Sequence, residues 1–446
     1  MTGIRYAPAQ LARLLGVAEP TAEQAAVISA TPGPMAVIAG AGSGKSETMA
    51  ARLVWLVANG LATPERVLGL TFTRKAAAEL AQRVRVRLDG LRGAGFAGGG
   101  AGSAGGGAAD GAQAGDDLLG DPVVSTYHAY AGRLVADNAL REALEPSLRL
   151  ITPAVAWQLA ARVVASYDGP MDAVSWAPAS VTAAVLDLSG ELAEHLRGPD
   201  DVRAAGEWLA RRYGELSRPS ALARKIIECQ QTREQLLPLV AAYAAAKAAR
   251  EVIDYGDQMA LAARIAAAHP EVGAAERARY QVVLLDEYQD TSHAQLVLLR
   301  ALFGGGHPVT AVGDPCQSIY GWRGASAGNL LRFAADFPPR GGGPAPVRLL
   351  STSFRNTGRV LDAAAAVSSS AQTTVPRPAR AGGATSRGTP GAAARSSACS
   401  AAAASRTRPV LRKLVDSSRT GAGPPPRGGK SAAKRSRLPA LAPRQP

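Results

Sequence analysis

A glycine-rich segment that leads into a lysine and a serine could bind the phosphates of a nucleotide. The segment consists of Ala39, Gly40, Ala41, Gly42, Ser43, Gly44, Lys45 and Ser46. Glycines let backbone N–H groups curl around a phosphate, a following helix N-terminus adds positive charge, and Lys45 reaches the β and γ oxygens, while the Ser46 hydroxyl ligates magnesium. Glycine-rich low-complexity sequence can imitate such a loop. A strand-like run before the segment and a helical pattern after it favour a P-loop that binds ATP and Mg²⁺.

Two adjacent carboxylates at the end of a second apolar run supply the acid–base chemistry that a P-loop needs. Asp286 and Glu287 directly follow residues 282–285. Asp286 can hold magnesium through water, and Glu287 can accept the proton of an attacking water molecule. The alternative is a solvated acidic strand end, which the P-loop upstream disfavours.

Short apolar runs that end in small or polar residues predict the buried parallel strands that position these groups. The runs are residues 35–39, 67–71, 123–126, 282–285, 309–312 and 347–350. Residues 46–58, between the first two runs, carry apolar side chains at helical spacing and stop before Asn59 and Gly60. Strands that alternate with helices predict an α/β fold with a parallel sheet covered on both faces.

Changes in composition divide the chain into parts. Residues 93–115 are almost all Gly and Ala and predict a mobile loop. Residues 154–249 lack strand-like runs and carry Ala-rich helical patterns, with turn signals at 168–170, 189–190 and 198–199. We therefore expect an α/β domain in two parts, residues 1–150 and 251–367, an inserted all-α subdomain at 151–250, and a disordered basic tail at 368–446.

The positive charge of the chain is concentrated in that tail. The 446 residues have a formal net charge of +14, but residues 356–446 carry 16 basic and two acidic residues, and the preceding part is balanced. DNA binding is therefore not inferred from net charge. Three widely spaced cysteines do not suggest a disulfide framework. With neither a signal-peptide pattern nor a long apolar stretch, we expect a soluble cytoplasmic protein that does not contact a membrane.

Seven segments in a fixed order resemble the motifs of superfamily 1A helicases of the UvrD, Rep and PcrA type. In chain order they read TAEQ, AGAGSGKS, LTFTRKAAAEL, STYHAYA, LLDEYQDT, VGDPCQSIYGWRGA and SFRNT, and they lie within residues 20–361. Within that family, the Ala-rich composition and the helical insert look most similar to the AdnB-type motor of an actinobacterial helicase-nuclease. The resemblance implies that the α/β domain is recA-like.

The resemblance also implies roles around the nucleotide. Gln24 would bond the edge of adenine with its donor and its acceptor, and Phe354 would stack on adenine where the family more often has Tyr. Gln317 would sense the γ-phosphate, and Arg355 would supply positive charge to it. The alternatives are an ordinary polar residue on the first helix for Gln24 and a salt-bridged surface residue for Arg355.

Single-stranded DNA is the partner that the resemblance implies. Phe72, Tyr320 and Trp322 match positions on which bases stack, worth about 1 to 3 kcal/mol per base. Arg74, His128 and Arg323 are candidate backbone contacts. Core packing is the alternative for an isolated aromatic residue, but Tyr320 and Trp322 lie in a Gly-rich polar loop, which favours stacking.

By resemblance, the function is ATP-dependent DNA unwinding with 3′ to 5′ movement in repair or recombination. The substrates would be single strands and DNA junctions or ends, and a second helicase-nuclease subunit would be a partner. Motifs of a second recA-like domain do not follow residue 361, and the tail resembles translation in a shifted frame. We expect ATP binding, very slow hydrolysis and no processive unwinding by this polypeptide alone.

Two other function classes stay open. A DNA-binding module without catalysis would rely on the basic tail and would keep its DNA affinity when Lys45 is lost. A P-loop ATPase of another kind, such as a partner-regulated switch, would show neither stimulation by DNA nor an effect of Trp322→Ala. The ordered motifs argue against this second class.

Overall fold

The computed structural model of the chain describes residues 4–93, 120–145, 148–321, 324–370 and 379–380. Three predicted features lie wholly or largely outside these residues. They are Trp322 with Arg323, the predicted mobile loop from residue 94 onward, and the predicted tail apart from 368–370 and 379–380.

A parallel sheet of six strands lies at the centre of the fold. Its strand order is β3-β2-β6-β7-β1-β8, and every neighbouring pair is parallel. The strands are β1 (Met35–Ala39), β2 (Val67–Thr71), β3 (Val123–Thr126), β6 (Val282–Leu285), β7 (Val309–Gly313) and β8 (Val347–Leu350). All six predicted runs are confirmed. Because the strands are parallel, their carboxyl ends and the loops that follow them share one edge of the sheet.

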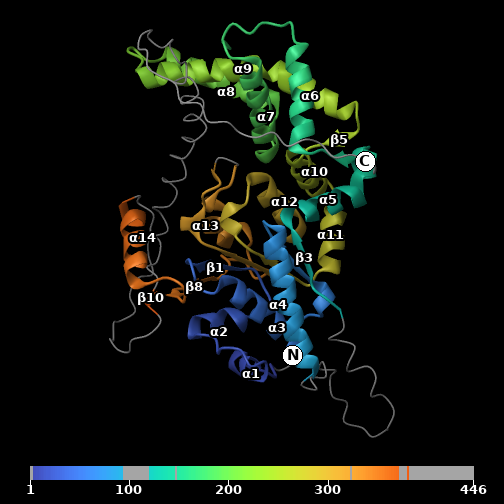
Figure 1. Ribbon diagram of the computed structural model, residues 1–446, viewed down its shortest axis with the longest axis vertical. Coiled ribbons are helices and arrows are strands. Elements are labelled where there is room, and N and C mark those ends of the chain that lie inside the picture. Colours follow the sequence, from blue (N-terminus) through green and yellow to red (C-terminus); the bar gives the residue numbers. More distant parts are fainter. Residues whose placement is uncertain (1–3, 94–119, 146–147, 322–323, 371–378, 381–446) are drawn as a thin grey trace, which may run out of the picture.

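Helices cover both faces of this sheet (Figure 1). One face packs against α1 (Pro8–Leu14), α2 (Ala22–Ile28), α3 (Lys45–Ala58) and α4 (Arg74–Gly93). The other face packs against α5 (Tyr127–Asn138), α10 (Tyr255–Ala268), α11 (Pro270–Arg279), α12 (His293–Phe303) and α13 (Ala327–Asp336). Strand side chains alternate between the two cores, with Val283 and Leu285 in one and Val282 and Leu284 in the other. Burial on both faces explains why the strands read as continuous apolar runs.

A buried arginine in α3 holds α2 in place. It therefore helps to position Gln24, the predicted nucleotide contact on α2. Arg52 is 1% exposed. Its guanidinium donates hydrogen bonds to the carbonyl oxygens of Val27, Ile28 and Ala30 and to the Thr310 hydroxyl. Burial lowers the pKa of Arg52 to about 10. The carbonyl groups that end α2 therefore have a charged donor inside the core.

Four helices form a separate group beyond the sheet, in the upper part of Figure 1. They are α6 (Pro153–Ala165), α7 (Pro178–Glu194), α8 (Pro199–Gly214) and α9 (Ala221–Ala248), flanked by a short parallel pair, β4 (Arg149–Leu150) and β5 (Val252–Ile253). Helices α6, α7 and α9 share a hydrophobic cluster of their own. The turn expected at 189–190 is wrong, because Gly190 lies inside α7. The tighter glycine at this contact is Gly256, where an added Cβ atom would lie 3.2 Å from the Ala193 Cβ and 3.7 Å from the Gly190 Cα.

Short elements complete the described part of the chain. They are η1 (Pro64–Arg66), η3 (Ala139–Glu142), η4 (Tyr288–Asp290), η5 (Pro315–Gln317), β9 (Thr352–Ser353), α14 (Gly358–Ser370) and β10 (Ala379–Arg380). The pair formed by β9 and β10 is parallel. The sequence predicted no strand in the segment that contains β10. Within the described ranges, no helix is both long and apolar enough to cross a membrane.

Candidate nucleotide and DNA site

The P-loop connects β1 to α3 and uses glycines where the backbone is left-handed. Gly42 and Gly44 have φ angles of 75° and 79°. A Cβ atom on Gly44 would lie 2.9 Å from the Gln24 side-chain nitrogen, and one on Gly42 would lie 2.8 Å from the Arg355 Cβ. Other residues at these positions would be strained and would collide with their neighbours. Gln24 and Arg355, which were predicted to contact adenine and the γ-phosphate, therefore lie next to this loop.

The segment from Ser353 to Asn356 holds the carbonyl groups of the P-loop. The Ser353 hydroxyl and the Asn356 amide donate to the Ala41 carbonyl at 2.9 and 3.0 Å, and the Phe354 N–H donates to the Gly42 carbonyl at 2.9 Å. These three hydrogen bonds fix the P-loop against the segment from Ser353 to Asn356. The sequence motif placed Phe354 and Arg355 here but did not indicate these bonds.

The P-loop fits a nucleotide phosphate with its magnesium ion. Lys45 is the first residue of the 14-residue helix α3, and Ser46 follows it at the positive end of the helix dipole. The Ser43 hydroxyl is buried and has no hydrogen-bond partner within the described ranges. Lysine and hydroxyl groups at a helix N-terminus, opposite a carboxylate, are the donors and ligands that ATP and Mg²⁺ require.

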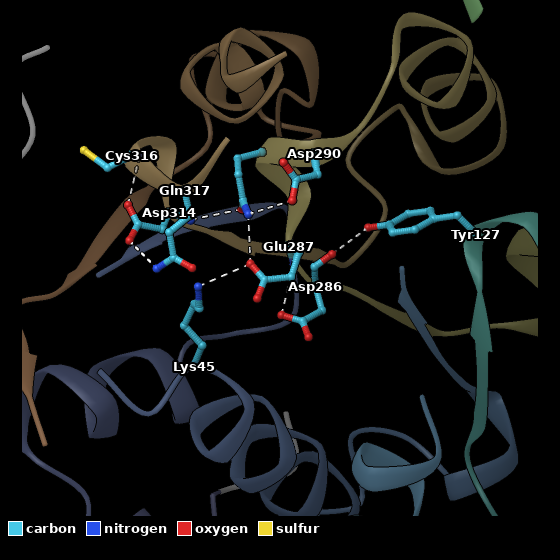
Figure 2. Close-up of polar contacts among 9 residues, drawn as sticks. Lys45, Tyr127, Asp286, Glu287, Asp290, Asp314, Cys316 and Gln317 are labelled. Atoms are coloured by element: carbon cyan, nitrogen blue, oxygen red, sulfur yellow. Dashed lines mark hydrogen bonds and ion pairs between the residues drawn. The ribbon is translucent and has the colours of Figure 1, made fainter. Parts of the chain in front are cut away.

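The predicted metal ligand Asp286 and the predicted general base Glu287 lie at the end of β6, across from the P-loop (Figure 2). Glu287 accepts a hydrogen bond from the Lys45 ammonium group, with 3.2 Å between Nζ and Oε2. Its backbone is left-handed, with φ of 50°, a strained conformation typical of functional sites. Asp286 is 7% exposed, and burial, with the neighbouring Glu287 charge, raises its pKa to about 6. A metal ion would hold such a carboxylate in its charged form.

Gln317 lies in the next loop along the same edge, after β7. Its amide donates to the Asp314 carboxylate at 2.7 Å. Asp314 also accepts from the Cys316 N–H at 3.0 Å, which caps η5. Hydrogen bonds through Gln289 connect this loop to Glu287 and hence to Lys45. The sequence did not indicate Gln289 as a site residue, because its hydrogen bonds reach Glu287 and Asp314 only in the folded chain.

A cavity of about 330 Å³ adjoins the P-loop on its outer side. It is lined mostly by apolar residues of α1, α2 and α3, together with Gln24, Gly44 and Phe354. Phe354 is 57% exposed, so its ring is available for stacking. The sequence did not indicate that the first 20 residues contribute to this cavity.

Gln24 already has partners at both ends of its amide. Its oxygen accepts the Thr21 N–H at 3.0 Å, and its nitrogen donates to the Ser43 carbonyl at 3.3 Å. The neighbouring Glu23 carboxylate accepts the N–H and the hydroxyl of Ser351 at 2.7 and 2.6 Å. Gln24 is therefore part of a helix cap as well as of the cavity wall. One further proton and one further lone pair remain for a ligand.

Four of the residues predicted to contact DNA lie in the described part of the chain, and they follow three strands of the sheet at the same edge. Phe72 follows β2 and packs against Tyr127 with 4.7 Å between ring centroids. His128, in α5 after β3, makes an edge contact with Tyr255 at 5.8 Å. Arg74 is exposed at the start of α4. Tyr320 lies beyond β7 and is 43% exposed. Phe72 is therefore partly a core residue, whereas Tyr320 is exposed.

Comparisons with known proteins show which family the chain resembles. The chain matches the UvrD/REP helicase N-terminal domain over residues 20–338. An ATP-dependent DNA helicase PcrA of Leuconostoc citreum is 27% identical over 345 residues, which are 77% of this chain and 38% of that protein. The PcrA of Staphylococcus aureus strain Mu50 is 26% identical over 347 residues, which are 77% of this chain and 39% of that protein.

The chain thus spans about two fifths of the length of these curated relatives. The matched range includes the P-loop, the carboxylates after β6 and the loop after β7. Since the match covers more than half of the sequence, the chain belongs to the family of the UvrD/REP helicase N-terminal domain.

Proposed function

We propose that the chain is the ATP-binding part of an ATP-dependent DNA helicase. The proposal rests on the 3.2 Å contact between the Lys45 ammonium group and the Glu287 carboxylate, because this contact places the predicted phosphate-binding lysine beside the predicted general base. The two residues are 242 positions apart in the chain. The names of the PcrA relatives support helicase activity as the reaction class.

Each side chain has a distinct task in this proposal. Lys45 neutralises charge on the β and γ phosphate oxygens, while Ser46 and Asp286 hold Mg²⁺. Glu287 accepts a proton from the attacking water molecule, and Gln317 and Arg355 respond to the γ-phosphate. Bound ATP supplies the phosphoanhydride bond whose hydrolysis drives movement. The apolar cavity beside Phe354 and Gln24 accommodates the adenine base.

The second ligand in this proposal is single-stranded DNA, at the loops after β2, β3 and β7. Phe72, Tyr320 and Trp322 would stack on bases, and Arg74, His128 and Arg323 would contact phosphates. Stacking without base-specific hydrogen bonds suits a motor that moves along any sequence. We further propose movement from 3′ to 5′, a role in repair or recombination at junctions or ends, and an AdnB-type arrangement with a second helicase-nuclease subunit.

For the 446-residue polypeptide by itself we propose ATP binding with slow hydrolysis and no processive unwinding. Within the described ranges, all nucleotide-site residues surround a single recA-like sheet. A motor of this kind moves when a second such domain closes on the nucleotide, and that domain contributes further charge to the γ-phosphate. Robust strand displacement by the purified chain would overturn this part of the proposal.

The test is the rate of ATP hydrolysis with and without single-stranded DNA, for the wild type and Glu287→Gln. We expect measurable ATP binding by both proteins, stimulation of hydrolysis by DNA in the wild type, and loss of hydrolysis by about 100-fold or more in the variant. Glu271→Gln, an exposed carboxylate on α11 that pairs with Arg141, is the control. A wild type that binds no ATP would exclude the proposal, and hydrolysis insensitive to DNA would favour another class of P-loop ATPase.

A further inference from the structure

Gln289 is a buried amide between the nucleotide side of the site and the loop that leads to Tyr320. It lies in η4, two residues after Glu287, and is 1% exposed. Its nitrogen donates to the Glu287 carboxylate at 2.9 Å and to the Asp290 carboxylate at 3.3 Å. Its side-chain oxygen accepts the Asp314 N–H at 3.0 Å. Both ends of the amide are therefore used, and they point to different elements.

Gln289 packs closely against the end of β7. A Cβ atom on Gly313, the last residue of β7, would lie 2.4 Å from the Gln289 side-chain oxygen and 3.2 Å from its backbone nitrogen. The Gln289 carbonyl in turn accepts a hydrogen bond from the Ser318 hydroxyl at 3.1 Å. The side chain and the backbone of one residue thus hold both ends of the turn from Asp314 to Ser318.

The residues beyond this turn face solvent. Asp314 holds Gln317 at 2.7 Å, and the chain then reaches Ile319 and Tyr320, which are 69% and 43% exposed. On the other side of Gln289, Glu287 is bonded to Lys45. A continuous series of hydrogen bonds therefore runs from the phosphate-binding lysine to the base of the exposed aromatic loop.

We propose that Gln289 is a positioning residue that couples nucleotide binding at Lys45 and Glu287 to the affinity of the Tyr320 loop for single-stranded DNA. This inference rests on the proposed function. When phosphate oxygens engage Lys45, the Glu287 carboxylate loses a partner and shifts. Gln289 must follow it or lose its bond, and a shift of Gln289 leaves the buried Asp314 N–H unpaired unless the turn moves as well. The amide thus converts a change at Glu287 into a change at Asp314.

The experiment measures coupling between the two ligands. The affinity of the full 446-residue chain for a fluorescent oligothymidylate is determined with and without Mg²⁺ and a slowly hydrolysed ATP analogue, by anisotropy. For the wild type we expect the nucleotide to change this affinity by at least about 5-fold. We call the ratio of the DNA affinities with and without nucleotide the coupling ratio. For Gln289→Leu we expect a coupling ratio near 1, with nucleotide affinity within about 3-fold of the wild type. If Gln289 were only a structural residue, its substitution would weaken the binding of both ligands and leave the coupling ratio unchanged.

Gln295→Leu is the matched control. Gln295 is also a buried glutamine, 3% exposed, but its side chain accepts the Ser292 N–H in the cap of α12 and has no bond to the site. We expect this variant to keep the coupling ratio of the wild type. Thermal unfolding shows whether each variant is folded. If Gln289→Leu does not fold, Gln289→Glu replaces it, since its carboxylate keeps an acceptor for the Asp314 N–H but cannot donate to Glu287.

The possible outcomes separate this inference from the proposed function. A wild type that binds both ligands with a ratio of 1 overturns the inference and leaves the proposed function intact. A folded Gln289 variant that keeps the wild-type ratio does the same. A wild type that binds neither ligand overturns the proposed function, and the inference with it. Loss of coupling in the Gln289 variant but not in Gln295→Leu supports the inference.

Discussion

The hydroxyl group of Tyr127 donates a hydrogen bond to the backbone carbonyl of Asp286, with 3.1 Å between the two oxygens. Tyr127 begins α5, one residue before His128, and its ring packs against Phe72. Asp286 is the proposed magnesium ligand at the end of β6. The segment after β3 therefore contacts the end of β6 through Tyr127, and the segment after β2 packs on the same tyrosine through Phe72. Burial raises the pKa of Tyr127 well above its usual range, so the phenol remains a donor.

Removal of this hydroxyl should destabilise the fold. Tyr127→Phe keeps the ring contact with Phe72 but leaves the buried carbonyl of Asp286 without this donor, at a cost of about 1 to 3 kcal/mol. Urea unfolding followed by circular dichroism measures the free energy. Tyr213→Phe on α8 is the control and should change it by less than about 0.5 kcal/mol. Equal stability of Tyr127→Phe and the wild type would show that this bond contributes nothing.

Loss of the Lys45 ammonium group should weaken ATP binding. A charge-assisted contact contributes about 1.5 to 3 kcal/mol, so we expect Lys45→Ala to raise the Kd for Mg²⁺-ATP by about 10- to 100-fold. Titration with a fluorescent ATP analogue measures this. Lys225→Ala on α9 should bind ATP as the wild type does. DNA affinity in the absence of nucleotide should be unchanged in both variants, and an unaltered Kd for ATP in Lys45→Ala would contradict the proposed site.

Two exposed aromatic residues should have separable effects. Tyr320→Ala should weaken binding of oligothymidylate by about 5- to 100-fold, as expected for the loss of one stacked base at about 1 to 3 kcal/mol, and should leave ATP affinity unchanged. Phe354→Ala should weaken ATP binding and leave binding of the oligonucleotide unchanged, because Phe354 lines the cavity beside the P-loop. Each variant is the control for the other. A reversed or shared pattern would show that the two loops are wrongly assigned.

A buried histidine should make stability depend on pH. Burial lowers the pKa of His307 to about 4, with smaller contributions from Arg277 and Arg340. In the unfolded chain its pKa is about 6.5, so between pH 4 and 6.5 the unfolded state binds the additional proton. The free energy of unfolding should therefore fall as the pH drops through this window, with up to about 3 kcal/mol from His307.

His307→Asn tests this directly, since asparagine does not titrate. The difference in unfolding free energy between pH 7 and pH 4.5 should be smaller in the variant than in the wild type, measured by urea unfolding at each pH. Carboxylates contribute equally to both proteins, so the comparison isolates the histidine. The same pH dependence in both proteins would mean that His307 keeps an ordinary pKa.

The sequence by itself determined the elements and the chemistry of the loops. Strands buried on both faces must be apolar throughout, so all six were readable, and the P-loop was readable because Gly42, Gly44 and Lys45 are adjacent in the chain. Asp286 and Glu287 were identified for the same reason, since they too are adjacent in the chain. The turn expected at 189–190 was wrong, since an isolated glycine is tolerated inside a helix and Gly190 lies within α7.

Only the tertiary structure decided which distant residues meet. Strand order depends on pairings between segments far apart in sequence, and periodicity does not encode the neighbour of a strand. The contacts of Lys45 with Glu287, of Glu23 with Ser351 and of Gln289 with Asp314 are consequences of that order. A glutamine such as Gln289 has no sequence signature for its role, because its function lies in two hydrogen bonds that exist only once β6 and β7 are side by side.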